Sequence, residues 1–264
     1  MARNELPDYG DVVEVLNPQG DSPVLLICEH ASPRIPEHLN GLGLSAQARE
    51  SHAAWDPGAL TVARLLSDAL GAPLVAGGVS RLVYDCNRPP ELQSAMPAQS
   101  ELIEVPGNIG LSNAARQERV EQVYRPFCAA IEGLISQRRK HAPIAAIVTV
   151  HSFTPVYFGV RREVEIGILH DSDSRFADAV LSRAPTVAPR ILRRNEPYGP
   201  EDDVTHSLKI HGVANGLHNV MIEIRNDLLT TPEDCATVAQ ELLHLLAPAL
   251  AEVGLGGSGV SAHA

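Results

Sequence analysis

The chain has 264 residues, of which 44% are hydrophobic and 20% are charged. These proportions are ordinary for a folded globular protein, so they argue against global disorder. The 32 acidic residues outnumber the 21 basic ones, which gives a formal net charge of -11. This balance argues against a broad nucleic-acid-binding surface, although it is compatible with a local basic pocket.

The sequence shows no sign of membrane insertion or secretion. The longest purely apolar stretches contain only about eight residues, whereas a membrane span needs roughly 20. The first 21 residues are polar and lack the apolar segment of a secretory signal. The four cysteines lie far apart without any CxxC pair, which is typical of reduced, buried thiols. We therefore expect a cytoplasmic protein with neither a membrane nor a nucleic acid as its partner, and an oligomer is compatible with the sequence.

Between a polar lead-in over residues 1–22 and a loose tail over 257–264, apolar strand-like runs alternate with helical patterns. Val24–Cys28 is a continuous apolar run, which is typical of a strand buried on both faces. In chain order, the patterns predict a strand at 24–28, a helix at 59–70, strands at 73–76 and 82–84, a helix at 112–139, strands at 144–150 and 165–169, a helix at 175–182, a strand at 186–192, a helix at 204–215, a strand at 219–224 and a helix at 231–251.

Several residues mark where the predicted helices begin and end. Pro57 and Gly71 flank the helix over 59–70. Ser112 is a candidate N-cap, and Pro126 predicts a kink or a break in the helix that follows it. The alternation of strands and helices predicts one α/β domain over residues 1–264, a three-layer sandwich with a central, mostly parallel but mixed sheet flanked by helices.

Polar side chains cluster where the predicted strands end, which is where open α/β sheets bind ligands. They are Glu29-His30-Ala31-Ser32 after the first strand, Asp85-Cys86-Asn87-Arg88-Pro89 after 82–84, His151-Ser152 after 144–150, Glu223-Ile224-Arg225-Asn226-Asp227 at the end of 219–224, and His52, Trp55 and Asp56 before the helix at 59–70. Two histidines and one carboxylate at such strand ends can hold a catalytic zinc, which keeps its fourth position for water.

Other groups at the same strand ends suit the remaining steps of a hydrolysis. Zinc lowers the pKa of a bound water to roughly 7, and a spare carboxylate such as Glu223 can accept the proton of that water. Arg88 can pair with a substrate carboxylate through two hydrogen bonds, and Asn87 can add one more. Each residue alone also has a structural interpretation, such as an ion pair between Glu223 and Arg225, but their convergence favours a metal hydrolase.

Seven short motifs follow one another along about residues 24–229. They are Cys28-Glu29-His30-Ala31-Ser32 with Ile35-Pro36, Ala54-Trp55-Asp56-Pro57-Gly58-Ala59, Ser80-Arg81-Leu82-Val83-Tyr84-Asp85-Cys86-Asn87-Arg88-Pro89, Pro106-Gly107-Asn108, His151-Ser152-Phe153-Thr154-Pro155, Asn195-Glu196-Pro197-Tyr198 and Ile222-Glu223-Ile224-Arg225-Asn226-Asp227-Leu228. In these motifs the sequence resembles the N-formylglutamate amidohydrolase family, specifically the branch that begins Cys-Glu-His-Ala-Ser. More distantly, the Asp-x-Asn-Arg element and the His…His…Glu order are similar to aspartoacylase and the zinc carboxypeptidases. The resemblance implies a phosphorylase/hydrolase-like fold with a central mixed sheet between helices.

The resemblance also implies a set of metal ligands. His30 and His151 are the implied zinc imidazoles, and Asp56 is the implied carboxylate ligand. The carboxypeptidase pattern has a Glu close after the first His, but in this sequence Pro33 stands three positions after His30. Glu37 is the nearest later acid, and it ranks second to Asp56 for this role. The implied cofactor is therefore one zinc ion.

Catalytic and substrate-binding roles follow from the same resemblance. Glu223 is the implied base, which activates water and then protonates the leaving amine. Arg88 either stabilises the oxyanion or, as we favour, holds the carboxylate of the amino acid together with Asn87. The other candidate pocket residues are Arg225, Asn195, Tyr198 and His211.

The implied reaction is the zinc-dependent hydrolysis of the amide bond in a small N-acyl amino acid such as N-formylglutamate, which gives a carboxylic acid and a free amino acid. This branch differs from the enzymes that carry Pro-His-Ser-Gly at the first site, so the acyl group and the side chain of the substrate stay open. N-formylglutamate needs a second cationic contact, for which Arg34, Arg81 and Arg225 are candidates.

Two alternatives belong to other classes of mechanism. The first is a non-catalytic, metal-free protein that binds acidic small molecules through Arg88 and Arg225. The second is an enzyme that uses Cys28 as a nucleophile near His30. Cys28 lies inside an apolar run, however, where a thiol is more often inert packing.

Overall fold

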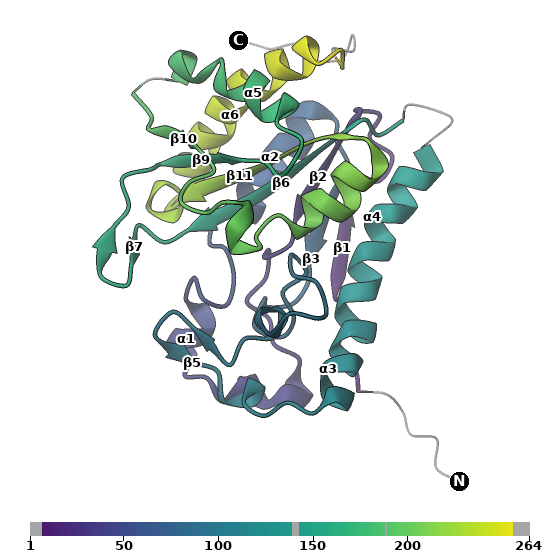
Figure 1. Cartoon of the computed structure of the whole chain (residues 1–264), viewed down its shortest axis with the longest axis vertical. Coiled ribbons are helices and arrows are strands. Elements are labelled where there is room, and N and C mark those ends of the chain that lie inside the picture. Colours follow the sequence, from purple (N-terminus) through teal and green to yellow (C-terminus); the bar gives the residue numbers. More distant parts are fainter. Residues whose placement is uncertain (1–6, 139–142, 188, 256–264) are drawn as a thin grey trace.

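A seven-stranded mixed sheet forms the centre of the computed structural model, which describes residues 7–138, 143–187 and 189–255 (Figure 1). The strands, in the order in which they lie across the sheet, are β1 (Val13–Leu16), β3 (Leu74–Gly77), β2 (Val24–Cys28), β6 (Ala146–Phe153), β11 (His218–Arg225), β9 (Ile166–Leu169) and β10 (Leu192–Arg194). The β2–β3, β2–β6, β6–β11 and β9–β10 pairs are parallel, whereas the β1–β3 and β9–β11 pairs are antiparallel. The prediction of a mixed, mostly parallel sheet is therefore confirmed.

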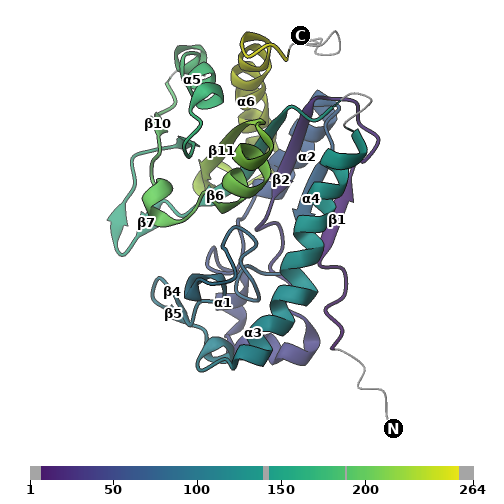
Figure 2. The ribbon, with the colours of Figure 1, turned by 45° about the vertical axis from the view of Figure 1, so that its right-hand side comes forward.

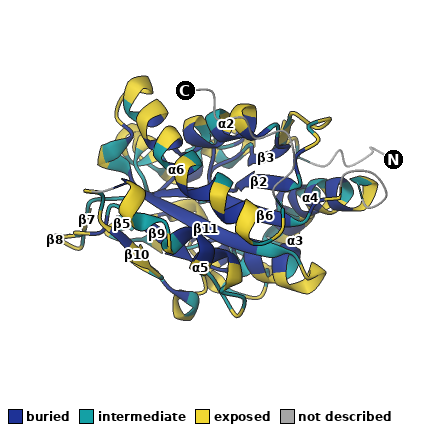
Figure 3. Cartoon of the chain, turned by 90° about the horizontal axis from the view of Figure 1, so that it is seen from above, coloured by how far each residue is buried: buried dark blue, intermediate teal, exposed yellow. Residues whose placement is uncertain are grey.

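Helices cover both faces of the sheet and complete three layers. They are α2 (Ala59–Leu70), α5 (Arg175–Leu181) and α6 (Pro232–Glu252) on one face and α4 (Arg125–Arg138) on the other. Successive side chains of a strand point to opposite faces, so Leu26 packs in the core with α2 and α6, whereas Leu25 and Ile27 pack in the core with α4. Figure 3 shows the result from above, with buried strands between helices whose outer sides are exposed.

The predicted helix ends are confirmed where capping groups are present. Gly71 ends α2 in the left-handed conformation, with a φ of 60°, that favours glycine. Before α6, the side chain of Thr231 accepts a hydrogen bond from the N–H of Asp234, whose own side chain accepts one from the N–H of Thr231. Ser112 caps α3 (Asn113–Arg119) by accepting a hydrogen bond from the N–H of Ala115.

A π-helical turn over Val120–Tyr124 separates α3 from α4, just before Pro126. Proline has no N–H and its ring crowds the preceding turn, so an irregularity at this position is expected. The helix is thus irregular beside the predicted position, but it is not broken, since the backbone stays helical from α3 through α4. The predicted helix end at residue 139 and the predicted loose tail over 257–264 lie outside the described residues.

Two of the predicted strands are wrong. Residues 82–84 form turns, because the hydroxyl of Ser80 accepts a hydrogen bond from the N–H of Leu82 and its carbonyl accepts one from the N–H of Val83. The strand predicted over 186–192 is wrong as well, since a 3-10 helix occupies Ala184–Val187 and β10 begins only at Leu192. Proline at position 189 has no N–H to contribute to a sheet there.

Four further segments differ from the prediction in part or in full. The helix predicted over 204–215 is present from residue 206 but irregular, because it continues as a π-helical turn, Leu208–Gly212, and ends in a 3-10 turn, Val213–Asn215. β1 forms inside the segment that was expected to be a loose lead-in. Two short hairpins were also not predicted; their strands are β4 (Gln99–Ser100) with β5 (Ile103–Glu104), and β7 (Val156–Tyr157) with β8 (Val160–Arg161).

The fold places several loops below the sheet, around the carboxyl ends of its central strands. In Figures 1 and 2, α1 (Ala46–Glu50) and the β4–β5 hairpin, with the loops that flank them, lie below the sheet, and β7 extends toward the same side. These loops therefore surround the sheet edge at which the sequence predicted a site. In the ranges that the structure describes, no helix combines the length and the apolarity that crossing a membrane demands.

Candidate metal centre and active site

Three parallel, neighbouring strands bring the predicted site residues to one edge of the sheet. His30 follows the end of β2 by two residues, and His151 lies near the end of β6. Glu223 lies directly opposite His151 in the β6–β11 pairing, so their side chains point to the same face. Asp56 precedes α2, and its backbone N–H donates to the carbonyl of His30 at 2.9 Å, which fixes this loop against the end of β2.

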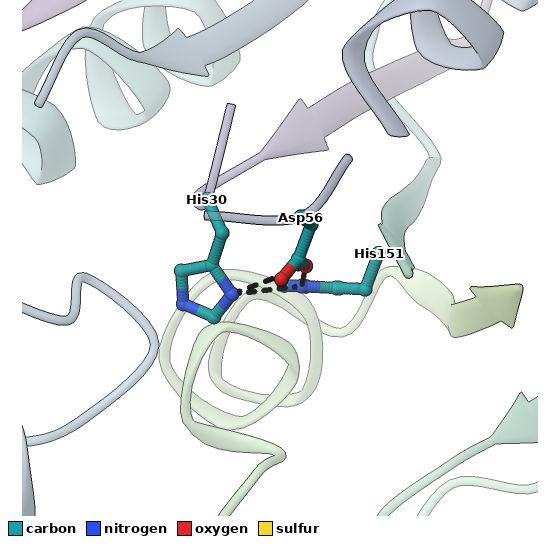
Figure 4. Close-up of side chains that lie close together, drawn as sticks. All are labelled: His30, Asp56 and His151. Carbon is teal, nitrogen blue, oxygen red and sulfur yellow. Dashed lines mark hydrogen bonds and ion pairs between the residues drawn. The ribbon is translucent and has the colours of Figure 1, made fainter. Parts of the chain in front are cut away.

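Three donor atoms of these residues converge on one point, as Figure 4 shows. Nδ1 of His30 and Nδ1 of His151 are 3.2 Å apart. Oδ2 of Asp56 lies 3.3 Å from the His30 nitrogen and 3.0 Å from the His151 nitrogen. All three residues are buried, and they come from three segments that are far apart in the sequence.

These distances suit a small divalent transition-metal ion. Three ligands placed about 2.0–2.1 Å from a tetrahedral zinc lie about 3.3–3.4 Å from one another. Calcium prefers about six to eight oxygen ligands at longer distances, so two imidazoles and one carboxylate do not suit it. His30, Asp56 and His151 can therefore hold a metal ion. Glu37, the second candidate for the carboxylate ligand, is exposed in a separate 3-10 helix, Glu37–Gly43, and lies outside this cluster.

Each imidazole also has a carboxylate at its other nitrogen. Nε2 of His30 donates to Oδ1 of Asp85 at 2.7 Å, and Nε2 of His151 lies 3.0 Å from Oε2 of Glu29. The second contact has the distance of an ion pair but not the alignment of a hydrogen bond. Carboxylates in these positions orient the rings and favour the tautomers whose Nδ1 is free to bind a metal. Both acids stand at the ends of predicted strands, but no role was predicted for them.

Arg81 and Ser152 hold the carboxylates of this cluster in place. The guanidinium of Arg81 donates to Oδ1 of Asp56 at 3.3 Å and to Oδ2 of Asp85 at 3.2 Å. The backbone N–H of Ser152 donates to Oδ2 of Asp56 at 3.2 Å. Burial alone disfavours both charges, but the neighbouring His30 and Arg81 outweigh it and lower the pKa of Asp56 and of Asp85.

The pKa values of the two imidazoles are shifted in the opposite direction from those of the carboxyl groups. Burial favours their neutral forms, but the adjacent carboxylates outweigh it and raise the pKa of His30 and, more strongly, that of His151. A metal ion binds only the neutral imidazole, so metal and protons compete for the same nitrogens. Metal binding at this cluster is therefore expected to weaken in acid.

Glu223 stands next to the cluster and has a different electrostatic environment. It is only 6% exposed. Burial raises the pKa of Glu223 to about 7; the charge of Asp56 acts in the same direction, whereas His151 opposes it. A carboxylate with a pKa near neutrality can both accept and return a proton at physiological pH.

A cavity of about 490 Å³ lies over these residues. We call its buried group the floor, which consists of His30, Asp56, His151 and Glu223. We call the side chains contributed by the two hairpins and their flanks the rim, which consists of Ser100, Glu101, Thr154, Tyr157 and Arg162. The volume and the polar lining suit a small charged molecule.

Glu101 connects the two hairpins of the rim. Its Oε1 accepts a hydrogen bond from the backbone N–H of Phe158 at 2.9 Å. Its Oε2 lies 3.0 Å from Nε2 of His52, in the loop before α2. Residues of the β4–β5 hairpin and the β7–β8 hairpin are thus held together at the edge of the cavity.

Arg88 and Asn87, which were predicted to act together, have different surroundings. Arg88 lines the cavity, and its Nη1 is buried without a partner among the described residues, so it can receive an anion. The side chain of Asn87 is already bonded, because its amide donates to the carbonyl of Val204 and its Oδ1 accepts from the N–H of Ser207. Asn87 therefore fixes the segment 204–207 beside the cavity.

Of the four other predicted pocket residues, Tyr198 lines the cavity. Asn195 uses its Oδ1 to accept a hydrogen bond from the N–H of His170 at 2.9 Å, which connects the ends of β9 and β10. His211 is buried in the π-helical turn and is not among the lining residues. Arg225 donates to the backbone carbonyls of residues 162–164 and borders a separate surface hollow.

Arg162 lines the cavity and was not predicted. Its guanidinium carbon lies 4.4 Å from the ring centroid of Tyr157, 4.7 Å from that of Tyr198 and 5.5 Å from that of Phe153. The sequence offered no signal for it, because it adjoins a hairpin too short to show a pattern. Arg34, an earlier candidate for a second cationic contact, donates instead to three backbone carbonyls and does not line the cavity.

The thiol of Cys28 belongs to the apolar core with α2 and α6. It is fully buried, and burial raises the pKa of this thiol well above its usual value. These surroundings do not suit a nucleophile. All four cysteines are buried and free, as the sequence predicted.

The profile of the N-formylglutamate amidohydrolase family matches residues 22–230. The chain belongs to this family. The gene product Atu2144 from Agrobacterium tumefaciens has a crystal structure that is similar to this chain, with 53% sequence identity and a TM-score of 0.90 over 93% of this chain and 97% of that one. The crystal structure of the N-formylglutamate amidohydrolase from Ralstonia eutropha JMP134 shares the fold, with a TM-score of 0.56 over 92% of this chain and 97% of that one, at 19% identity. No curated protein matches the chain.

Membership of the N-formylglutamate amidohydrolase family makes this chain a hydrolase that acts on a small molecule. The central mixed sheet between helices agrees with the fold of the family neighbour. The family resemblance found in the sequence motifs and the α/β architecture derived from them are therefore both confirmed.

Proposed function

We propose that this member of the family hydrolyses the amide bond of an N-acyl amino acid such as N-formylglutamate, in a zinc-dependent reaction in the cytoplasm. The products are a short carboxylic acid and a free amino acid. The observation that carries this proposal is the convergence of the donor atoms of His30, Asp56 and His151 beside Glu223, at the floor of a cavity with arginines in its wall. The four free, buried thiols support a reducing compartment.

His30, Asp56 and His151 would hold the zinc, while Asp85 and Glu29 orient the two imidazoles. When bound, zinc supplies a Lewis acid that polarises the amide carbonyl and lowers the pKa of water. The donor set supports this metal, since imidazole nitrogen and carboxylate oxygen are its usual ligands in catalytic sites.

Glu223 moves the proton in this mechanism. Its ionised carboxylate accepts a proton from the water that attacks the carbonyl carbon. The resulting carboxylic acid then donates this proton to the amide nitrogen as the C–N bond breaks. Burial raises the pKa of this carboxyl above its usual value, which favours the return of the proton that it has accepted.

Arg88 holds the α-carboxylate of the substrate. Its buried, unpartnered Nη1 is the polar atom in the cavity wall that most needs an anionic ligand. A guanidinium can bind a carboxylate through two parallel hydrogen bonds, which also fixes the orientation of the amide to be cleaved. Asn87 contributes indirectly, because it fixes the segment 204–207 beside Arg88.

A non-catalytic protein that binds acidic small molecules has less support. That function would use Arg88 and Arg225, but Arg225 is bonded to backbone carbonyls and borders a different hollow. The buried imidazoles and carboxylates of the floor would have no role in such a protein. Hydrolysis uses every member of the floor.

Metal analysis combined with an activity screen tests the proposal. Purified protein should contain about one zinc per chain and should hydrolyse at least one compound in a panel of N-formyl, N-acetyl and longer N-acyl amino acids. A chelator should remove both the metal and the activity, and added zinc should restore both. Thiol alkylation should have no effect. Binding of acidic ligands without metal and without turnover would support the non-catalytic protein instead.

A further inference from the structure

We propose that Arg162 is the specificity-determining residue of this site and that it binds a second carboxylate, the one on the side chain of the substrate. The inference rests on the proposed function, in which Arg88 binds the α-carboxylate. It names the residue that would select the acidic side chain present in N-formylglutamate, the compound after which the family is named. The second cationic contact comes from the rim, directly after β8, and not from Arg34, Arg81 or Arg225.

The first step concerns which guanidiniums of the cavity are free. Arg81 is occupied, because it bridges Asp56 and Asp85. Arg88 lies 4.0 Å from a carboxylate oxygen of Asp85. Arg162 also lines the cavity, and within the described residues no carboxylate lies within ion-pair distance of it. Of the three arginines in the cavity wall, Arg162 is thus the one whose charge has no acidic partner in the described chain.

The second step concerns how Arg162 is held. Its guanidinium lies within 5.5 Å of three ring centroids, those of Phe153, Tyr157 and Tyr198. Aromatic faces attract a cation and fix its plane without neutralising its charge. Its Nη1 donates to the hydroxyl of Tyr198 at 2.9 Å and, less closely, to the carbonyl of Thr154. The side chain is therefore oriented by the protein while its net charge is retained for a ligand.

The third step connects this group to the reacting part of the cavity. Tyr198 contacts Arg162, and both line the same cavity as Glu223. Burial, together with the charge of Glu223, raises the pKa of Tyr198 to about 12, so its hydroxyl remains neutral. A substrate with its amide at the floor and its α-carboxylate on Arg88 would extend its side chain toward this arginine. A neutral side chain would leave the guanidinium without a counter-charge, so the site selects an acidic one.

The decisive experiment compares N-formyl-L-glutamate with N-formyl-L-glutamine, which has nearly the same shape and lacks only the side-chain charge. Wild-type protein should prefer the glutamate compound by at least about tenfold in kcat/KM, the effect of one charged hydrogen-bonded pair. Arg162→Met should remove this preference, mainly through KM. The matched control is Arg161→Met, because Arg161 is the adjacent arginine, is exposed and borders a different hollow. The control should keep the preference.

Equilibrium binding separates this inference from the proposed function. Calorimetric titration with L-glutamate and L-glutamine measures the same discrimination without turnover. If the wild type hydrolyses both N-formyl compounds equally well, or if Arg162→Met keeps the preference, the role of Arg162 is refuted while the proposed reaction stands. If nothing is hydrolysed but glutamate binds more tightly than glutamine and Arg162→Met abolishes the difference, Arg162 is confirmed and the proposed reaction fails. Arg162→Lys keeps the positive charge but not the two parallel N–H donors of the guanidinium, so it should retain part of the preference. If Arg162→Met fails to fold, the role of Arg162 is decided by comparing the glutamate-to-glutamine ratio of kcat/KM in Arg162→Lys with that of the wild type.

Discussion

The floor and the rim of the cavity are built in different ways. The floor consists of side chains from the ends of β2, β6 and β11 and from the loop before α2. All of them are buried, and His30, Asp56 and His151 lie within ion-pair distance of one another or of further charged groups. The rim comes from two hairpins with strands of two residues each, and residues such as Phe158 and Leu102 at these hairpins are largely exposed. Under the proposed function, the sheet fixes the chemistry, while short surface segments select the substrate.

This contrast has a functional consequence. A change in the floor should alter the metal or the reaction rate, whereas a change in the rim should alter substrate preference or affinity. The variants below test that division, beginning with the largest expected effect.

His151→Ala should abolish both metal binding and activity. It removes one of three ligands, and it leaves Glu29 as a buried carboxylate without its imidazole partner. An uncompensated buried charge costs about 3–5 kcal/mol, so the melting temperature should fall as well. Metal content and turnover are measured on folded protein, as judged by circular dichroism. A His151→Ala protein that kept one zinc per chain and its activity would refute the proposed ligand set.

Glu223→Gln should lower kcat by about 10²–10⁴-fold while the protein keeps its metal. The amide is nearly isosteric with the carboxylate but cannot accept the proton of water. Glu223 is not a member of the ligand cluster, so zinc content serves as the internal control. Turnover close to that of the wild type would show that another group is the base.

The dependence of the reaction rate on pH should reveal the titration of Glu223. Burial raises the pKa of Glu223 to about 7, and the reaction needs its ionised form. The rate should therefore rise with pH by up to about tenfold per unit below the apparent pKa and level off above it. A bound cation stabilises the carboxylate, which moves this apparent pKa below 7. The measurement is kcat/KM between about pH 5 and about pH 8 at saturating zinc, and a flat profile would contradict the role of Glu223.

Glu29→Gln should weaken zinc binding by about 10–100-fold, because it removes the negative charge beside Nε2 of His151, which orients the ring. Competition with a chromogenic chelator measures the affinity. Glu37→Gln is the matched control, since Glu37 is an exposed glutamate outside the cluster. If Glu37→Gln lowers the affinity for zinc more than Glu29→Gln does, the carboxylate ligand has been assigned to the wrong residue.

Glu101→Gln should have the smallest effect, and it should act on the rim alone. It replaces the carboxylate that accepts a hydrogen bond from the N–H of Phe158 and contacts His52. The neutral amide can still accept a hydrogen bond but loses the negative charge, which weakens the two contacts by on the order of 1 kcal/mol, so KM should rise a few-fold while kcat and zinc content stay unchanged. Hydrogen exchange at residues 156–161 should become faster. The control is Glu104→Gln, an exposed glutamate in the same hairpin.

The same division explains how much of the site could be predicted from the sequence. His30, His151 and Glu223 follow or end long apolar runs, and such runs are recognisable because strands buried on both faces contain little else. Parallel strand ends meet at one edge, so these three residues could be brought together without coordinates. The three-layer fold could be predicted for the same reason.

The rim could not be predicted, because its structure depends on contacts between distant segments. The bond from Phe158 to Glu101 joins residues separated by 57 positions, and the hairpins it connects are too short to show periodicity. The surroundings of Arg225 could not be predicted either. The family resemblance made it a candidate pocket residue, but its guanidinium donates hydrogen bonds to the carbonyls of residues 162–164 beside a different hollow.

Arg81 has a consequence for how the two carboxylates beside it behave as a pair. By spanning Asp56 and Asp85 it supplies a positive charge between two acids that would otherwise repel each other. Both acids therefore stay ionised at close quarters, and the pKa of each is lowered. One guanidinium thus fixes both the candidate ligand Asp56 and the acid that orients the ring of His30.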